Sequence, residues 1–180
     1  MYSTIIALFS FAIAVTACGG GSSAPTCTGT GCTCTDSACT CAAGTDCKTE
    51  CGADACSLNC TQAAKCNGNS DDALSVTCND SSACKGIGGD ASHATCLATS
   101  NCDFKLGAQS VATCSAGAVC KLELGTASTV TCADQSSCNI KCDEGCHATC
   151  TGTAACAVTC GAAASAATMC ATGVYACGPC

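Results

Sequence analysis

Cysteine is the residue type with the greatest chemical capacity in this chain, which has 27 cysteines among 180 residues. Thiolates coordinate soft metal ions, closely spaced pairs carry out redox exchange, and paired thiols form disulfides. Twelve cysteines follow one pattern: each cysteine is followed by a second one six residues later, and this pair recurs every eighteen residues. They are Cys60, Cys66, Cys78, Cys84, Cys96, Cys102, Cys114, Cys120, Cys132, Cys138, Cys150 and Cys156. A period sustained over six units is typical of a repeat protein whose units stack on their neighbours.

Two other chemistries are open to the remaining cysteines. The Cys-Thr-Cys runs at 32–34 and 39–41 have spacings that could chelate a soft ion, so an exported thiolate metal-binding protein, similar to a metallothionein, is one alternative. The Cys-Gly-Pro-Cys segment at 177–180 could be a redox pair, although closing the last repeat is the favoured interpretation. The cysteine content lies well above the roughly 8–10% that marks a disulfide scaffold, so disulfides are expected for most of these residues.

No other residues form a catalytic or metal-binding set. His93 and His147 occupy one phase of the repeat but are three repeats apart, or about 14 Å in stacked strands, so they cannot share an ion. The acidic pairs Asp71-Asp72 and Asp143-Glu144 fall in expected turns, where solvated acids or at most a weak calcium site are predicted. The chain has neither Trp nor Arg, and no nucleophile with a partnered base is visible. We expect no enzyme activity, no cofactor, no bound metal and no small-molecule substrate.

The elements that position the cysteines are short β-strands. Residues 102–107 and 120–125 alternate strictly between inward and outward types and end in Gly, which indicates a strand with one buried face. Residues 75–78 and 129–132 predict a second, shorter strand in each repeat.

The outward charges test whether these strands stack in register. One column reads Lys85, Asp103 and Lys121, and another reads Lys105, Glu123 and Lys141. Opposite charges on neighbouring strands stabilise a sheet by about 0.2–1 kcal/mol, whereas like charges repel. Both columns therefore predict eighteen-residue coils that stack in parallel and in register.

The inward columns predict an all-β fold, a narrow disulfide-laddered β-solenoid of about six rungs, where a rung is one eighteen-residue coil. One column reads Phe104, Leu122, Ile140 and Val158, whereas Gly68 and Gly86 hold this phase in the first two rungs, so the C-terminal half is expected to pack better. We divide the chain into a signal peptide (1–17), a lipidated Cys and tether (18–26), an irregular Cys-rich cap (27–59), the rungs (60–167) and a C-terminal cap (168–180).

The N-terminus predicts export. The apolar run from Ile5 to Val15 is too short to span a bilayer, for which about 20 residues are needed, but suits a signal peptide. The segment Val15-Thr16-Ala17-Cys18 resembles the lipobox of bacterial lipoproteins, which implies acylation of Cys18 and anchoring in a membrane; Gly19 then implies sorting to the outer membrane. Setting Cys18 aside leaves 26 cysteines, an even number that can pair completely. Exported chains meet oxidising conditions that favour disulfides.

A threonine precedes the first cysteine in five of the six rungs. These residues are Thr77, Thr95, Thr113, Thr131 and Thr149. Together with the Cys-x5-Cys spacing, best seen at 149–156, they resemble the repeat of beetle antifreeze proteins, whose twelve-residue coils form a β-solenoid. The resemblance implies one disulfide within each rung, between each cysteine and the one six residues on. Bridges between rungs remain an alternative, because Cα atoms one rung apart also lie in disulfide range.

Net charge and the threonine column limit the functions. A net charge of −7 without a basic stripe argues against nucleic acid. Ice binding needs two flat threonine columns and only one is intact, so it is a further alternative. We predict a secreted, non-catalytic, envelope-anchored structural or adhesive protein, attached to the membrane by its N-terminal lipid and facing an envelope or surface partner.

Overall fold

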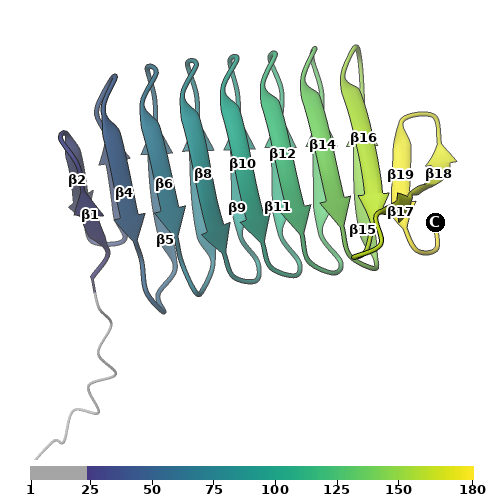
Figure 1. The fold of residues 1–180 in the computed structure, drawn as a ribbon, viewed down its shortest axis with the longest axis horizontal. Coiled ribbons are helices and arrows are strands. Elements are labelled where there is room, and N and C mark those ends of the chain that lie inside the picture. Colours follow the sequence, from purple (N-terminus) through teal and green to yellow (C-terminus); the bar gives the residue numbers. More distant parts are fainter. Residues whose placement is uncertain (1–23) are drawn as a thin grey trace, which may run out of the picture.

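The computed structural model describes residues 24–180, in which nineteen strands form two sheets. Figure 1 shows the strands side by side along one long axis, with the first described strands and the C-terminus at opposite ends. The chain passes alternately between the sheets, so each rung gives one strand to each. No helix occurs in this range, and the predicted all-β solenoid with cysteines bridged along its coils is confirmed.

Each sheet collects one strand from every rung. Sheet A contains, in spatial order, β1 (Thr26–Thr28), β4 (Asp46–Glu50), β6 (Lys65–Asn69), β8 (Ala83–Gly88), β10 (Asn101–Leu106), β12 (Val119–Leu124), β14 (Ser137–Cys142), β16 (Ala155–Cys160) and β17 (Ser165–Ala166). Sheet B contains β18 (Thr168–Ala171), β19 (Val174–Cys177), β15 (Cys146–Cys150), β13 (Thr129–Cys132), β11 (Val111–Cys114), β9 (His93–Cys96), β7 (Leu74–Cys78), β5 (Cys56–Cys60), β3 (Ala38–Cys41) and β2 (Cys32–Thr35). Strands of successive rungs pair in parallel, and antiparallel pairs close both ends.

The register is the one that the charge columns predict. Asp103 on β10 pairs with Lys85 on β8 and with Lys121 on β12. Glu123 on β12 pairs with Lys105 and Lys141 in the same way. Stacking of eighteen-residue coils in register is therefore confirmed.

Each rung turns from sheet B to sheet A through a tight left-handed turn. Between β11 and β12, the Ala118 N–H donates to the Ser115 carbonyl at 3.2 Å, and Ala116 and Gly117 have φ of 54° and 78°. Positive φ at both central residues is the type I′ geometry. Other rungs place non-glycine residues at both positions, namely Gln62 and Ala63, Asp80 and Ser81, Ala98 and Thr99, and Asp134 and Gln135. Most rungs thus hold strained turn residues.

Replacing Ala116 by glycine is expected to stabilise the protein by about 0.5–1 kcal/mol. The left-handed conformation disfavours a residue with a Cβ by about 1–2 kcal/mol, which exceeds the roughly 0.5–1 kcal/mol of backbone entropy that glycine loses on folding. Urea unfolding with the disulfides intact measures the difference. The matched control is Ala118→Gly, two residues on, at a fully buried position without positive φ. A loss of stability in Ala116→Gly equal to that in Ala118→Gly would contradict this account.

The return turn, from sheet A to sheet B, contains a ladder of buried serines. The Leu74 N–H donates to Ser92 Oγ at 2.9 Å, and that hydroxyl donates to the Gly89 carbonyl at 2.7 Å. One rung further, the Ser92 N–H donates to Ser110 Oγ at 3.2 Å. Both serines are fully buried, so their hydroxyls bond backbone groups that water cannot reach.

The core is a thin layer of sulfur and aliphatic groups between the sheets. Phe104, Leu122 and Ile140 are successive register partners in sheet A, and none is more than 1% exposed. At the same phase in the earlier rungs, neighbouring side chains take the place of a side chain, from sheet B at Gly68 and from both sheets at Gly86. A Cβ on Gly68 would lie 3.0 Å from Leu58, and one on Gly86 would lie 3.2 Å from both Leu74 and Phe104.

The poorer packing expected at Gly68 and Gly86 is therefore not found. Leu58 and Leu74 from sheet B are at most 2% exposed and fill the N-terminal rungs. In the last rung, Val158 and Cys160 are only partly buried. The reason is that β17 pairs only with Thr159 and Cys160, which leaves most of the outer edge of β16 without a partner strand.

The region 27–59, expected to be an irregular cap, contains a further rung. Cys41 on β3 pairs with Cys60, and Cys47 on β4 pairs with Cys66. Both separations are nineteen residues, so the rung follows the ladder but not the period. The cap itself is smaller, consisting of β1 and β2, which add antiparallel strands to β4 and β3.

Candidate functional site

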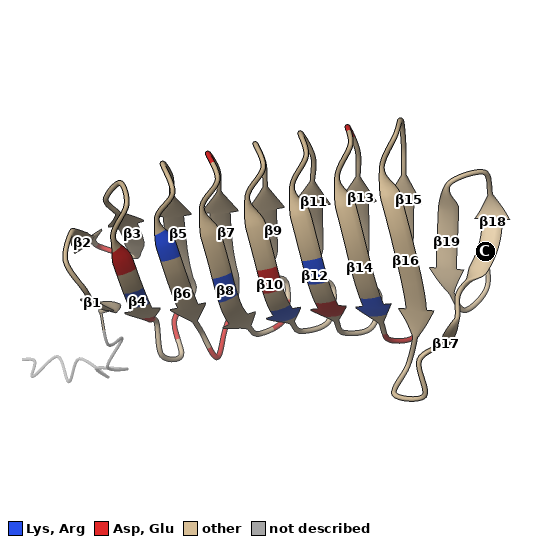
Figure 2. Cartoon of the chain, turned by 45° about the horizontal axis from the view of Figure 1, so that its top comes forward, with Lys and Arg blue, Asp and Glu red and all other residues tan. Residues whose placement is uncertain are grey.

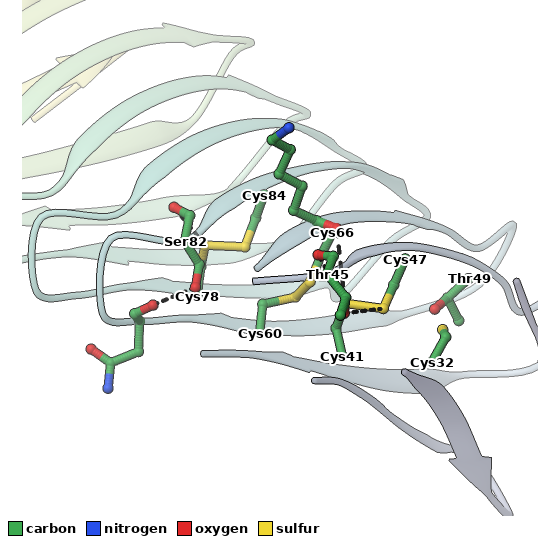
Figure 3. The surroundings of a disulfide bond; sticks show 12 residues. Cys32, Cys41, Thr45, Cys47, Thr49, Cys60, Cys66, Cys78, Ser82 and Cys84 are labelled. Carbon is green, nitrogen blue, oxygen red and sulfur yellow. Dashed lines mark hydrogen bonds between the residues drawn. A yellow bond between two sulfur atoms is a disulfide. The ribbon is translucent and has the colours of Figure 1, made fainter. Parts of the chain in front are cut away.

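The cysteines from Cys27 onward form thirteen disulfides, which run the length of the solenoid. Six lie within regular rungs: Cys60–Cys66, Cys78–Cys84, Cys96–Cys102, Cys114–Cys120, Cys132–Cys138 and Cys150–Cys156. The pairing implied by the antifreeze resemblance is thus the one present. Their Cα atoms are 6.2–6.6 Å apart, a separation set by the turn that joins the two sheets. Figure 3 shows Cys78–Cys84, Cys60–Cys66 and Cys41–Cys47 in a row across successive coils.

Sequence reasoning missed a second set of bridges at the return turn. Cys142–Cys146 joins β14 to β15, and Cys51–Cys56 occupies the same phase near the N-terminal end. In the rungs between, Leu74 or a buried serine stands at the phase of the second cysteine. The signal that could have found them is the recurrence of a second close cysteine pair, Cys142 and Cys146, at the end of the longer strand of its rung.

The remaining bridges hold the two ends. Cys27–Cys32, Cys34–Cys39 and Cys41–Cys47 lie in the N-terminal region. At the C-terminal end, Cys177 is bonded to Cys160 and Cys180 to Cys170, so the cysteines of the Cys-Gly-Pro-Cys segment are not bonded to each other. Cys160–Cys177 ties β16 of sheet A to β19 of the C-terminal hairpin, in agreement with closure of the last rung.

These bridges remove the ligands that a thiolate metal site would need. The Cys-Thr-Cys runs at 32–34 and 39–41 lie on β2 and β3, and all four of their cysteines are bridged. No cysteine in the described part of the chain has a free thiol.

The outer face of sheet B carries hydroxyl groups and no charge. The threonine column forms one continuous register, in which Thr113 pairs with Thr95 and Thr131. Beside it runs a mixed column of Ser75, His93, Val111, Thr129 and His147. No strand of sheet B contains Lys, Asp or Glu. His93 and His147 lie on this face three rungs apart, so the structure does not bring them together.

The outer face of sheet A carries all six lysines of the protein, as Figure 2 shows by their position on its strands. They are Lys48, Lys65, Lys85, Lys105, Lys121 and Lys141. Four of the thirteen acids lie on the same strands, which gives this face a charge of 6 − 4 = +2. The other nine acids lie in turns, including the pairs at 71–72 and 143–144. Sequence reasoning found the alternating columns but not this separation of lysines from most acids.

The ion pairs of sheet A are exposed. Lys121 Nζ lies 3.5 Å from Asp103 Oδ1, and Lys65 Nζ lies 3.7 Å from Asp46 Oδ1. Glu50 is the most strongly held acid: its carboxylate accepts from Lys48 at 2.9 Å and from Asn69 at 3.1 Å. The hydrogen bond from Lys48 lowers the pKa of Glu50. Partial burial opposes this, and the Asn69 hydrogen bond and the charge of Lys48 lower the pKa further.

Asp103→Lys is expected to destabilise the protein by about 1 kcal/mol at low salt. The change removes the pair with Lys121 and aligns three lysines on neighbouring strands, where like charges repel. Salt screens exposed charges, so the loss should shrink between about 0.01 and 1 M ionic strength. The measurement is urea unfolding at both salt concentrations. Asn139→Lys, beside Lys121 in the same column but opposite Ala157 on its other side, is the control and should cost less. A loss that does not respond to salt would argue against an electrostatic cause.

A broad depression of the described surface also lies on sheet A. It has a volume of about 500 Å³ and is open to solvent along β6 and β8, where Lys65, Lys85 and Asn101 surround the small Ala83. Three cysteines line it, Cys47, Cys66 and Cys84, and each is bonded within the disulfide ladder.

The comparisons with known proteins add no relative: no family model, curated protein or solved structure matches this chain. Among the described residues there is no helix with the length and apolarity needed to cross a bilayer. Cys18 and the expected signal peptide lie outside the described residues.

Proposed function

We propose that this protein is a non-catalytic structural or adhesive element of a bacterial cell envelope, exported and anchored by a lipid on Cys18. The observation that carries the proposal is the disulfide ladder. It joins the two sheets at every rung from Cys41–Cys47 to Cys150–Cys156, so the rod keeps its shape without a large apolar core. So many disulfides favour an oxidising environment outside the cytoplasm.

Support for the anchor comes from the sequence and from the pairing of the other cysteines. The run from Ile5 to Val15 suits a signal, and the lipobox-like segment places Cys18 at the point where a lipoprotein is acylated. The thirteen bridges use every cysteine from Cys27 to Cys180, which agrees with a separate role for Cys18. Gly19 favours the outer membrane.

The outer face of sheet B is the surface that we assign to a partner. It is regular and uncharged, and the threonine column offers hydroxyls that donate and accept hydrogen bonds. A polar envelope or surface component fits this face better than nucleic acid, since the lysines are all on the opposite sheet and are interspersed with acids.

Export of the full chain in a lipoprotein-processing bacterium tests the anchor. The wild type is expected in the outer-membrane fraction, with the mass of an acyl chain on a peptide beginning at Cys18. Cys18→Ser should be released into the soluble fraction with the same disulfides. A wild type that is soluble and unacylated would overturn the anchor but not the structural role.

Alkylation before and after reduction tests the structural role against thiolate metal binding. The purified wild type should react with no alkylating agent at Cys27–Cys180 before reduction, and should contain no stoichiometric zinc or copper. Several reactive thiols together with bound metal would overturn the proposal in favour of a metal protein. Ice binding receives no support from the face of sheet B, because His93 and Val111 interrupt the column beside the threonines.

A further inference from the structure

The sulfur atoms of neighbouring rungs lie against one another inside the solenoid. The Sγ atoms of Cys132, Cys138 and Cys156 are all within 4.8 Å of one another. The same arrangement recurs in the sets Cys60, Cys66 and Cys84; Cys96, Cys102 and Cys120; and Cys114, Cys120 and Cys138. In each set, two sulfurs form the bridge of one rung and the third is the second cysteine of the next rung. Each of these bridges therefore has a sulfur of the following rung beside it.

A bridge between the rungs is sterically allowed at this place. Cys138 on β14 and Cys156 on β16 are register partners in sheet A. Adjacent strands bring such Cα atoms to about 4.8 Å, which lies within the usual range of about 4.4–6.8 Å for a disulfide. Their Cβ atoms, about equally far apart, lie just beyond the usual range of about 3.5–4.5 Å, so a Cys138–Cys156 bond needs a small approach of the two strands.

Exposure gives this exchange a direction. Cys132 and Cys138 are buried, at 0% and 3% exposed. Cys150 and Cys156 belong to the last rung and are only partly buried. Water solvates a thiol or thiolate better than the core does. A thiol at Cys150 is therefore favoured over a thiol at Cys138.

We propose that this column of sulfurs is a thiol–disulfide exchange site that moves an unpaired thiol from the core to Cys150. When Cys138 lacks its partner, its side chain rotates and its thiolate attacks Sγ of Cys156. The Cys138–Cys156 bond forms, the Cys150–Cys156 bond breaks, and Cys150 leaves as a thiolate that takes a proton from water. One disulfide is made and one is lost, so the step consumes neither oxidant nor reductant.

A buried hydroxyl stands beside the attacking sulfur. Ser136 Oγ lies 3.9 Å from Cys138 Sγ, and Ser136 is 1% exposed. A donor to the thiolate favours the charged form that attacks. The rungs on either side have alanine at this phase, Ala118 and Ala154, so the fold accepts the residue without the hydroxyl. Ser136 is thus a positioning residue for the exchange.

The exchange adds a repair step to the stabilising role of the disulfide ladder, and it does not depend on the envelope anchor. A rung that loses its bridge in the core becomes linked to its neighbour, and the thiol emerges at the end of the rod. There a small external disulfide, or an exported protein with a reactive disulfide, can oxidise it.

The direct test is the variant Cys132→Ser, made as the full chain under oxidising conditions. After incubation at pH 8.5, trapping with a maleimide under mild acid and non-reducing peptide mapping, the label is expected on Cys150, together with a peptide linked through Cys138 and Cys156. A label on Cys138 with an intact Cys150–Cys156 bridge would overturn the proposal.

Two matched variants separate exchange from mere removal of a bridge. Cys51→Ser leaves Cys56 unpaired and 5% exposed, but its register partner on β7 is Leu74, so the label should stay on Cys56. Cys150→Ser leaves Cys156 unpaired in the partly exposed rung. Attack of Cys156 on Cys138 would release a thiol at the buried Cys132, so the label should stay on Cys156. Migration of the label in both variants would mean general scrambling and would contradict the assigned direction.

Rates and the wild type provide independent readouts. In the Cys132→Ser background, Ser136→Ala should slow the appearance of the Cys150 label several-fold without changing its final position; an unchanged rate would remove Ser136 from the account. If Cys132→Ser does not fold, the proposal is tested on the wild type. The wild-type protein is treated at pH 8.5 with less than one equivalent of a small monothiol. The first linkage between rungs is expected at Cys138–Cys156, and a first linkage elsewhere would overturn the proposal.

Discussion

Complete reduction is expected to unfold the protein at neutral pH and 25 °C. On the chain-entropy account, a bridge that closes five or six residues stabilises a fold by about 2 kcal/mol. The six regular rung bridges together contribute about 12 kcal/mol, which matches the whole net stability of a typical domain, about 5–15 kcal/mol. Far-UV circular dichroism should therefore lose its β signal when a phosphine reductant is added.

The control for this experiment is the oxidised protein in the same buffer with oxidised phosphine. Reoxidation after dilution should restore the signal if the reduced chain is unfolded and not aggregated. A reduced protein that still unfolds cooperatively in urea would show that the aliphatic core alone sustains the solenoid.

Phe104→Ala is expected to lower the free energy of unfolding by about 3–5 kcal/mol, the usual range for a buried phenylalanine. Phe104 is the largest fully buried side chain, at 1% exposed, and it extends over Gly86 of the preceding rung. Truncation leaves a void bounded by sheet backbone and disulfides, which cannot collapse easily. Urea unfolding with intact disulfides measures the loss.

The matched control for Phe104 is Ile87→Ala on the neighbouring strand. Ile87 is 56% exposed, so its truncation should change stability by less than about 0.5 kcal/mol. Comparable losses in both variants would mean that the inward and outward assignments of sheet A do not govern stability.

The sequence predicted the regular rungs well because two independent signals agree there. Cysteine spacing defines the period, and the pairs Lys85–Asp103 and Glu123–Lys141 define the register. The additional N-terminal rung escaped because its return turn is one residue longer. Four residues separate Cys51 from Cys56, whereas three separate Cys142 from Cys146. One inserted residue in a turn changes the eighteen-residue spacing of the cysteines, although the strands still pair in register.

The packing of the core could not be predicted from the inward residues of one sheet alone. Gly68 and Gly86 look like gaps when sheet A is considered alone. Leu58 and Leu74 close these gaps from sheet B, and their reach across the core depends on how far apart the sheets lie. That distance follows from the bridges and turns together. The confinement of the lysines to sheet A is likewise recognised only when both strands of each rung are compared.

The position of the chain ends decides how such a rod is presented to its surroundings. The first described strand, β1, lies at one end of the long axis and the C-terminus near the other (Figure 1). An attachment on the N-terminal side of β1 therefore holds the rod at one end and leaves the other end free. The outer faces of the two sheets then point laterally toward neighbouring molecules: the face of sheet B is uncharged and that of sheet A carries the lysines. The last rung and the C-terminal hairpin form the free end.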